Sequence, residues 1–129
     1  MATHSNNLVP QMLEIDWLST FFLILSPTGV VFWIAGSWMM NRPPRKINEW
    51  VGYRTKRSMG SQEAWDYAQI FSSKVSIKMG RFLTLGGAFG IFASGIHELV
   101  QALLATFLVI YACIHLMLVT EKELKLKFS

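Results

Sequence analysis

The residues whose types and spacing suit chemistry lie between positions 48 and 66 of this 129-residue chain. Glu63 and Asp66 stand three residues apart, so on a helix their carboxylates face one another as an acid–base pair would. Thr55 and Ser58 are hydroxyls in a basic stretch, but nucleophilic catalysis also needs a positioned base and an orienting group. The segment has no histidine to serve as that base. We therefore expect that the protein is not an enzyme and has no cofactor.

The same segment is better suited to binding. Arg54 can make a two-point contact with a carboxylate or a lipid phosphate, and acids at 49, 63, 121 and 123 are available as partners. Asn48 and Thr55 can cap free backbone groups. Two interpretations remain open. The segment is a structural clasp between the loop and the helix ends, or a recognition surface for an anionic headgroup, a peptide or a cytoplasmic regulator.

His115 lies in the last apolar run, where an ionisable residue is a functional candidate. No acid neighbours it in sequence, and Cys113 is offset by two positions and so does not share its helix face. We expect a neutral histidine that bonds to a neighbouring helix. Clusters with the usual ligand spacing are absent from the sequence, so we expect no metal site.

Long apolar helices must position these residues, because 52% of the chain is hydrophobic and only 16% is charged. Soluble domains carry about 25% charged residues. Uncharged runs predict three transmembrane helices, each long enough for a hydrocarbon core of ~30 Å once Lys78 and Arg81 extend towards the headgroups. The expected segments are an extracytoplasmic tail 1–16, helices 17–40, 78–96 and 99–120, a cytoplasmic signature segment 41–77 and a cytoplasmic tail 121–129.

A short amphipathic helix is predicted at about 62–75, between the first and second spans. Ser61 suits its N-cap, and Glu63 favours its first turn. Helical spacing puts two sets of residues on opposite faces, apolar Trp65, Ala68, Phe71 and Val75 and polar Gln62, Asp66, Gln69 and Ser73. Such a helix would lie in the membrane interface, with Trp65 at headgroup level. The expected fold is therefore an all-α membrane protein with three transmembrane helices and one short interfacial helix.

The cations set the orientation of these spans. All 12 Lys and Arg residues fall between 42 and 81 or after 121, whereas the first sixteen residues and the turn at 97–98 have none. The positive-inside rule makes the basic side cytoplasmic, so the N-terminus lies outside and the C-terminus inside. This arrangement explains the net charge of +4 without nucleic acid, which we do not expect as a partner. The expected partners are the bilayer and its anionic headgroups.

Small residues mark a packing face in the second span. Gly86, Gly90 and Ser94 follow four-residue spacing, which lets two helix backbones approach closely in lipid. They would pack within the chain, against the first span near Gly29 and Gly36 or against the third span. The alternative is a face on which a homo-oligomer forms.

The signature segment resembles a known family. Asn48, the run Gly52-Tyr53-Arg54-Thr55, and then Ser61, Glu63, Trp65 and Ala68 resemble the signature of the SdpI/YfhL family of bacterial membrane proteins. The three-span frame, from about Arg42 onwards, is similar to the family's module. The resemblance implies a bacterial cytoplasmic (inner) membrane protein whose ligand- or partner-binding residues are Asn48, Gly52, Tyr53, Arg54, Thr55, Glu63 and Trp65.

The family is named for immunity against a secreted, membrane-active killing peptide of sporulating bacilli. Its founding type also holds a transcriptional repressor at the membrane and has further spans before this module. The resemblance covers the module alone. It implies immunity to, or sensing of, a membrane-active peptide toxin through a cytoplasmic-face signature. The alternative is a structural or lipid-binding accessory subunit of a membrane complex.

Overall fold

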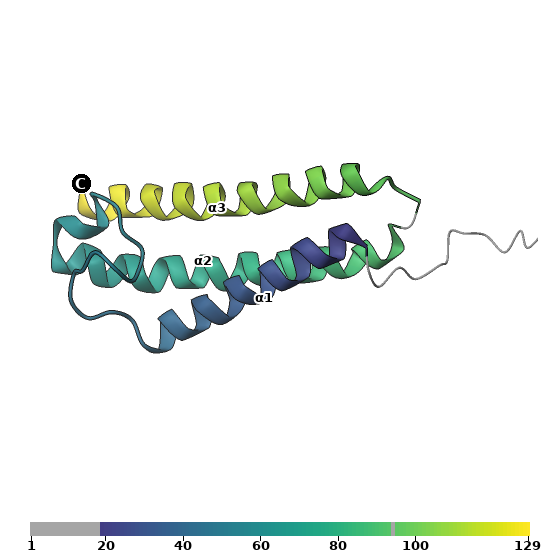
Figure 1. Cartoon of the computed structure of the whole chain (residues 1–129). Coiled ribbons are helices and arrows are strands. Elements are labelled where there is room, and N and C mark those ends of the chain that lie inside the picture. Colours follow the sequence, from purple (N-terminus) through teal and green to yellow (C-terminus); the bar gives the residue numbers. More distant parts are fainter. Residues whose placement is uncertain (1–18, 94) are drawn as a thin grey trace, which may run out of the picture.

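The computed structural model describes residues 19–93 and 95–129, and all regular elements there are helical. The predicted tail at 1–16 and Ser94 lie outside this part. Three long helices run back and forth beside one another (Figure 1), and the C-terminus lies next to the loop between the first two. The elements are α1 Thr20–Asn41, the 3₁₀ turn η2 Ser58–Gly60, α2 Gln62–Phe89, the 3₁₀ turn η3 Gly90–Phe92 and α3 Glu98–Phe128.

α1 begins and ends where its sequence sets the limits. The Ser19 hydroxyl caps the first turn by accepting a hydrogen bond from the Phe22 N–H at 3.2 Å. The helix continues through Pro27 and ends at Asn41, just before Pro43 and Pro44, because a residue that precedes a proline is disfavoured in helical conformation. α1 and α3 are each long and apolar enough to cross a membrane, which suggests a membrane protein.

α2 is one helix where the sequence predicted two. It runs unbroken from Gln62 to Phe89, so the separate interfacial helix at 62–75 and the span at 78–96 are not distinct elements. No Gly or Pro interrupts the chain between 62 and 79, and nothing there stops the helix. The Ser61 cap is confirmed, since its hydroxyl accepts from the Ala64 N–H at 3.1 Å. The helix ends before residue 96 because three glycines at 86, 87 and 90 weaken it.

The amphipathic interpretation of this segment is also corrected. Trp65, expected at headgroup level, is fully buried, and so is Gln69, which was placed on the polar face. Ser73 is only 3% exposed. Gln62 and Asp66 of the predicted polar face are exposed, but Gln69 and Ser73 are covered, because the preceding loop folds against Gln69 and α1 packs against Ser73.

Glycines hold α1 and α2 in close contact. A Cβ built at Gly80 would lie 2.5 Å from the backbone nitrogen of Trp33, and one at Gly36 would lie 2.9 Å from the Ser73 carbonyl oxygen. Gly29 and Gly87 lie equally close to Thr84 and Ser26. Such sites let backbones approach to distances that any larger residue would prevent.

This contact corrects the predicted packing triplet. Gly86 faces open space, with no atom within 4 Å of a built Cβ, so it does not pack within the chain. Gly90 lies against Phe21 and Phe22. The face that packs on α1 therefore passes through Gly80, Gly87 and the predicted Gly90 but not through Gly86, and Gly29 and Gly36 contact α2 as expected.

α3 is fastened at its first turns by a buried glutamine. Gln101 is 3% exposed, and its amide donates to the carbonyls of Ala93 and Ile96 at 3.1 and 2.8 Å. Its oxygen accepts from the Phe21 N–H at 3.2 Å, a donor left free at the start of α1. One side chain thus joins the turn before α3 to α1.

We expect Gly80→Ala to destabilise the protein by ~1–3 kcal/mol, because the added methyl group has no space against Trp33. Gly86→Ala, the same change on an open face of the same helix, should be neutral or stabilising by up to ~1 kcal/mol. Thermal unfolding of both purified variants in one detergent measures the difference. Equal unfolding midpoints would show that the glycine contact does not hold the two helices.

Candidate functional site

The start of α2 holds the loop between α1 and α2, residues 42–61, which we call the signature loop. The Trp65 indole N–H donates to the Pro44 carbonyl at 2.7 Å. The Gln62 side-chain amide donates to the Arg45 carbonyl at 2.7 Å. Two side chains of the first helical turn therefore fix the chain just after the prolines that end α1.

Asn48 shapes the middle of the signature loop. Its side-chain oxygen accepts hydrogen bonds from the N–H groups of Trp50 and Val51 at 2.9 and 2.8 Å, and its amide donates to the Lys46 carbonyl at 3.0 Å. The predicted capping role of Asn48 is confirmed. The turn leaves the Trp50 side chain 87% exposed, so a large aromatic ring stands outward on ordered backbone.

Gln69 and Tyr53 form the centre of the site. The Gln69 side-chain oxygen accepts from the Tyr53 N–H at 2.7 Å, and its amide donates to the Tyr53 carbonyl at 3.0 Å. Because Gln69 is fully buried, these bonds form away from water, where an unpaired polar group costs most. Gly52 precedes this pair with φ +116°, and a Cβ there would lie 2.5 Å from the Gln69 oxygen. Only glycine suits that position.

Thr55 and Ser58 close the loop. The Ser58 hydroxyl accepts from the Thr55 N–H at 2.8 Å and lies 2.9 Å from the Tyr53 carbonyl, which its proton can reach. The Thr55 hydroxyl accepts from the Ser58 N–H at 3.2 Å. This confirms that Thr55 caps a free backbone group. Both hydroxyls are engaged with backbone groups.

The Tyr53 side chain joins the loop to α3. Its hydroxyl donates to the Glu121 carboxylate at 3.0 Å. Burial, and then the bond and charge of Glu121, raise the pKa of Tyr53 well above its ordinary value, so the phenol stays a neutral donor. Arg57 lies 3.5 Å from the other Glu121 oxygen, in a partly exposed ion pair that contributes little stability.

A second contact joins the start of α2 to the end of α3. The Tyr67 hydroxyl donates to Glu123 at 3.0 Å, and the Tyr67 ring meets the Phe128 ring edge-on with centroids 5.8 Å apart. The Lys127 ammonium lies 4.1 Å from the Tyr67 ring centroid. The last turns of α3 therefore pack on α2 through tyrosine.

The predicted signature residues divide into two groups. Tyr53, Thr55 and Trp65 point into the structure and hold it, as described above. Arg54 and Glu63 are exposed. Among residues 19–93 and 95–129 Arg54 has no carboxylate partner, and Arg57 makes the contact with Glu121 instead. Glu63 stands in the first turn of α2, where its charge complements the helix dipole.

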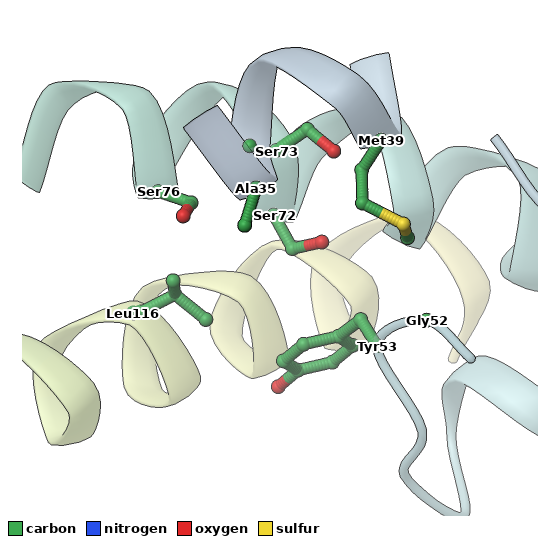
Figure 2. Close-up of a pocket in the computed structure, with 9 residues that line it drawn as sticks. Ala35, Met39, Gly52, Tyr53, Ser72, Ser73, Ser76 and Leu116 are labelled. Carbon is green, nitrogen blue, oxygen red and sulfur yellow. The ribbon is translucent and has the colours of Figure 1, made fainter. Parts of the chain in front are cut away.

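A cavity of about 260 Å³ lies beside Gly52 and Tyr53 (Figure 2), and all three long helices contribute to its wall. Serines 72, 73 and 76 line it, but their hydroxyls donate to backbone carbonyls within the bundle. Met39 and Leu116 make the rest of the lining largely apolar. The cavity suits an apolar side chain or acyl segment, and a group that entered it would contact Tyr53.

His115 does not make the predicted bond. Its ring stacks on Tyr111 of the same helix, with centroids 5.8 Å apart, and no hydrogen bond to another helix is found in the described part of the chain. Over the same residues, no group of three or more His, Cys, Asp or Glu side chains could hold a metal ion.

Sequence reasoning missed Gln69 and Ser58, the two buried side chains that organise the loop. Both look like surface residues, since glutamine and serine are mostly exposed in proteins. The available signal was the position of Gln69 beside the small residues Ala68, Ser72 and Ser73, which allow close packing.

We expect Gln69→Met to lower the free energy of unfolding by ~1–3 kcal/mol, because the similarly shaped side chain leaves the Tyr53 N–H and carbonyl buried and unpaired. Gln62→Met is the matched control on the exposed side of the same helix, where water replaces the lost bonds. Chemical denaturation in detergent measures both. Equal losses would contradict the central role of Gln69.

Comparisons with known proteins identify the family of this chain. A model of the SdpI/YfhL protein family matches residues 45–120, from the signature loop to the last turns of α3. The chain is also 35% identical, over 98 residues, to the uncharacterized protein YfhL of Bacillus subtilis (strain 168). The matched region covers 76% of this chain and 83% of that protein. No solved structure matches. The chain belongs to the SdpI/YfhL family.

Proposed function

We propose that this chain is an SdpI-like integral membrane protein with three transmembrane helices, and that it protects the cell against a membrane-active peptide or senses that peptide. The proposal rests on one observation, that the signature loop combines a backbone fixed by buried bonds with exposed side chains. Buried bonds to Trp65 and Gln69 fix its backbone, while Trp50 and Arg54 stand exposed on that fixed frame. A preordered surface of this kind binds with a lower entropic cost than a loose loop.

The proposed topology is supported by the ends of the helices. The Tyr53–Glu121 bond brings the basic signature loop beside the basic end of α3, so cations from both segments gather at one end of the bundle (Figure 1). The turn at 95–97, at the other end, contains no Lys or Arg. Under the positive-inside rule the loop end is cytoplasmic. The N-terminus is then outside.

Cysteine labelling tests this topology. In a Cys113→Ser background, Gly95→Cys should react with a membrane-impermeant maleimide in intact cells, because position 95 has open space around it. Lys56→Cys, exposed in the signature loop, should react only after the membrane is opened. The reverse pattern, or labelling of both sites in intact cells, would contradict three spans with a cytoplasmic loop.

The surface that we assign to recognition combines an aromatic ring and a cation. Trp50 supplies a large apolar contact area, and Arg54 supplies five fixed donors for a carboxylate or phosphate. Tryptophan and arginine are also the residues that dominate binding energies at protein interfaces. Membrane-bound toxin and a cytoplasmic regulator are both within reach of a loop at the headgroup level.

Expression in a sensitive strain tests the immunity role. We expect the wild-type chain to reduce killing by the secreted peptide, and Trp50→Ala or Arg54→Ala to lose about tenfold or more of that protection, the equivalent of ~1.4 kcal/mol of binding. Membrane levels of both variants should remain normal, because neither side chain is buried. Lys56→Ala, another exposed cation of the same loop, is the control and should keep its protection.

Two outcomes would count against the proposal. If the wild-type chain leaves killing unchanged, immunity is excluded for that peptide. If Arg54→Ala lowers the amount of protein in the membrane, Arg54 is structural rather than part of a recognition surface. Gln69→Met calibrates this second readout, since it should lower membrane levels by weakening the frame.

A further inference from the structure

Three cations share one exposed face of α2. Lys74, Lys78 and Arg81 are separated by four and three residues, so they lie one above another along the helix, and all are exposed. Like charges at these spacings repel. The helix therefore carries a row of positive charge whose mutual repulsion destabilises α2.

Within residues 19–93 and 95–129 none of these three cations forms an ion pair, since the salt bridge found there joins Arg57 to Glu121. The sequence has no Asp or Glu in α1, none between Asp66 and Glu98, and none from there to Glu121. Asp66 accepts a hydrogen bond from Gln62 at 2.7 Å and lies two turns before Lys74. The compensating anion must come from outside these segments.

The row lies beside the membrane-spanning part of α1. Gly80 packs against Trp33, and the Arg81 guanidinium carbon lies 5.3 Å from the centroid of the Trp33 ring. Trp33 precedes the end of α1 at Asn41 by eight residues, or about 12 Å of helix. In the proposed topology Arg81 thus stands below the cytoplasmic headgroups, where an unpaired cation is costly.

An apolar groove adjoins the same tryptophan. Val30, Trp33, Ile34, Ser37, Trp38 and Asn41 line a groove of about 540 Å³ along the flank of α1. Trp33 belongs both to this groove and to the contact with Arg81. The cationic row and the apolar groove therefore meet at Trp33. This arrangement matches a ligand with an anionic head and a hydrocarbon tail.

We infer that this face binds an anionic glycerophospholipid of the cytoplasmic leaflet. Arg81 and Lys78 hold its phosphate, Lys74 adds attraction from the headgroup side, and one acyl chain lies along the groove between Trp33 and Trp38. Guanidinium binds phosphate through two parallel hydrogen bonds, and basic sites between helices on the cytoplasmic side suit acidic lipid headgroups. The inference rests on the proposed topology and not on the immunity role.

The test is a titration of the purified full chain in detergent, followed by native mass spectrometry. Phosphatidylglycerol should bind the wild type at least about tenfold more tightly than phosphatidylcholine with the same acyl chains, and K78Q/R81Q should lose that preference. K122Q/K125Q removes the same charge from the exposed end of α3 and should keep it. Arg81→Lys should keep part of it, because the charge remains without the two-point contact.

The acyl chain is tested separately, on the wild type and without charge substitutions. Phosphatidylglycerol with brominated chains should quench tryptophan fluorescence more than brominated phosphatidylcholine does, and this excess should fall in W33F/W38F. The measurement also covers the case in which K78Q/R81Q does not fold. Equal quenching by the two lipids, or equal loss of preference in K78Q/R81Q and K122Q/K125Q, would overturn the inference. Neither result would bear on protection against a peptide, which the killing assay measures.

Discussion

The loop end of this protein depends on one buried amide. Gln69 satisfies both backbone groups of Tyr53 at once, and each of the other contacts presupposes that this pair is in place. Tyr53 can reach Glu121 only from that backbone position, and Ser58 can reach the Tyr53 carbonyl only if the loop turns back there. A chain without regular secondary structure is thereby held by hydrogen bonds that α2 provides. Much of the family signature therefore consists of loop residues that complete this hydrogen-bond network with α2.

The glycine contact between α1 and α2 has a corresponding role along the bundle. Close approach at Gly29 and Gly80 leaves no room for side chains between the two helices, so larger groups must turn to the flanks. On one flank this places Arg81 over Trp33. On another flank, Leu25 of α1 and Leu83 of α2 form a surface on which the small residues Ala105 and Ala112 of α3 pack. The tight contact therefore decides which faces of the pair are charged and which are available for α3.

The sequence allowed prediction of the helices and of the loop's importance, but not of how the two are joined. Hydrophobic runs were sufficient to place α1 and α3, although α3 continues to Phe128 through the predicted tail at 121–129. The Ser61 cap and the Asn48 turn follow from local chemistry. The continuity of α2 was missed because a change in polarity near Ser76 resembles the boundary between two helices. No residue there ends the helix. The packing face was missed because Gly86 and Gly87 are equivalent in sequence, and only the position of α1 distinguishes them. Burial of Gln69 depends on residues sixteen positions away, which no local pattern reports.

The uninterrupted course of α2 has a mechanical consequence. Its 28 residues extend over about 42 Å, which is more than the ~30 Å of a hydrocarbon core, so in the proposed three-span topology one continuous helix would both cross the lipids and carry the signature loop. A hinge between an interfacial and a spanning helix would have isolated the loop from the bilayer. Under the proposed function, a peptide that thins or disorders the membrane would change the tilt of this continuous helix. That tilt would displace the signature loop at its end, so that deformation of the lipid becomes movement of the loop surface.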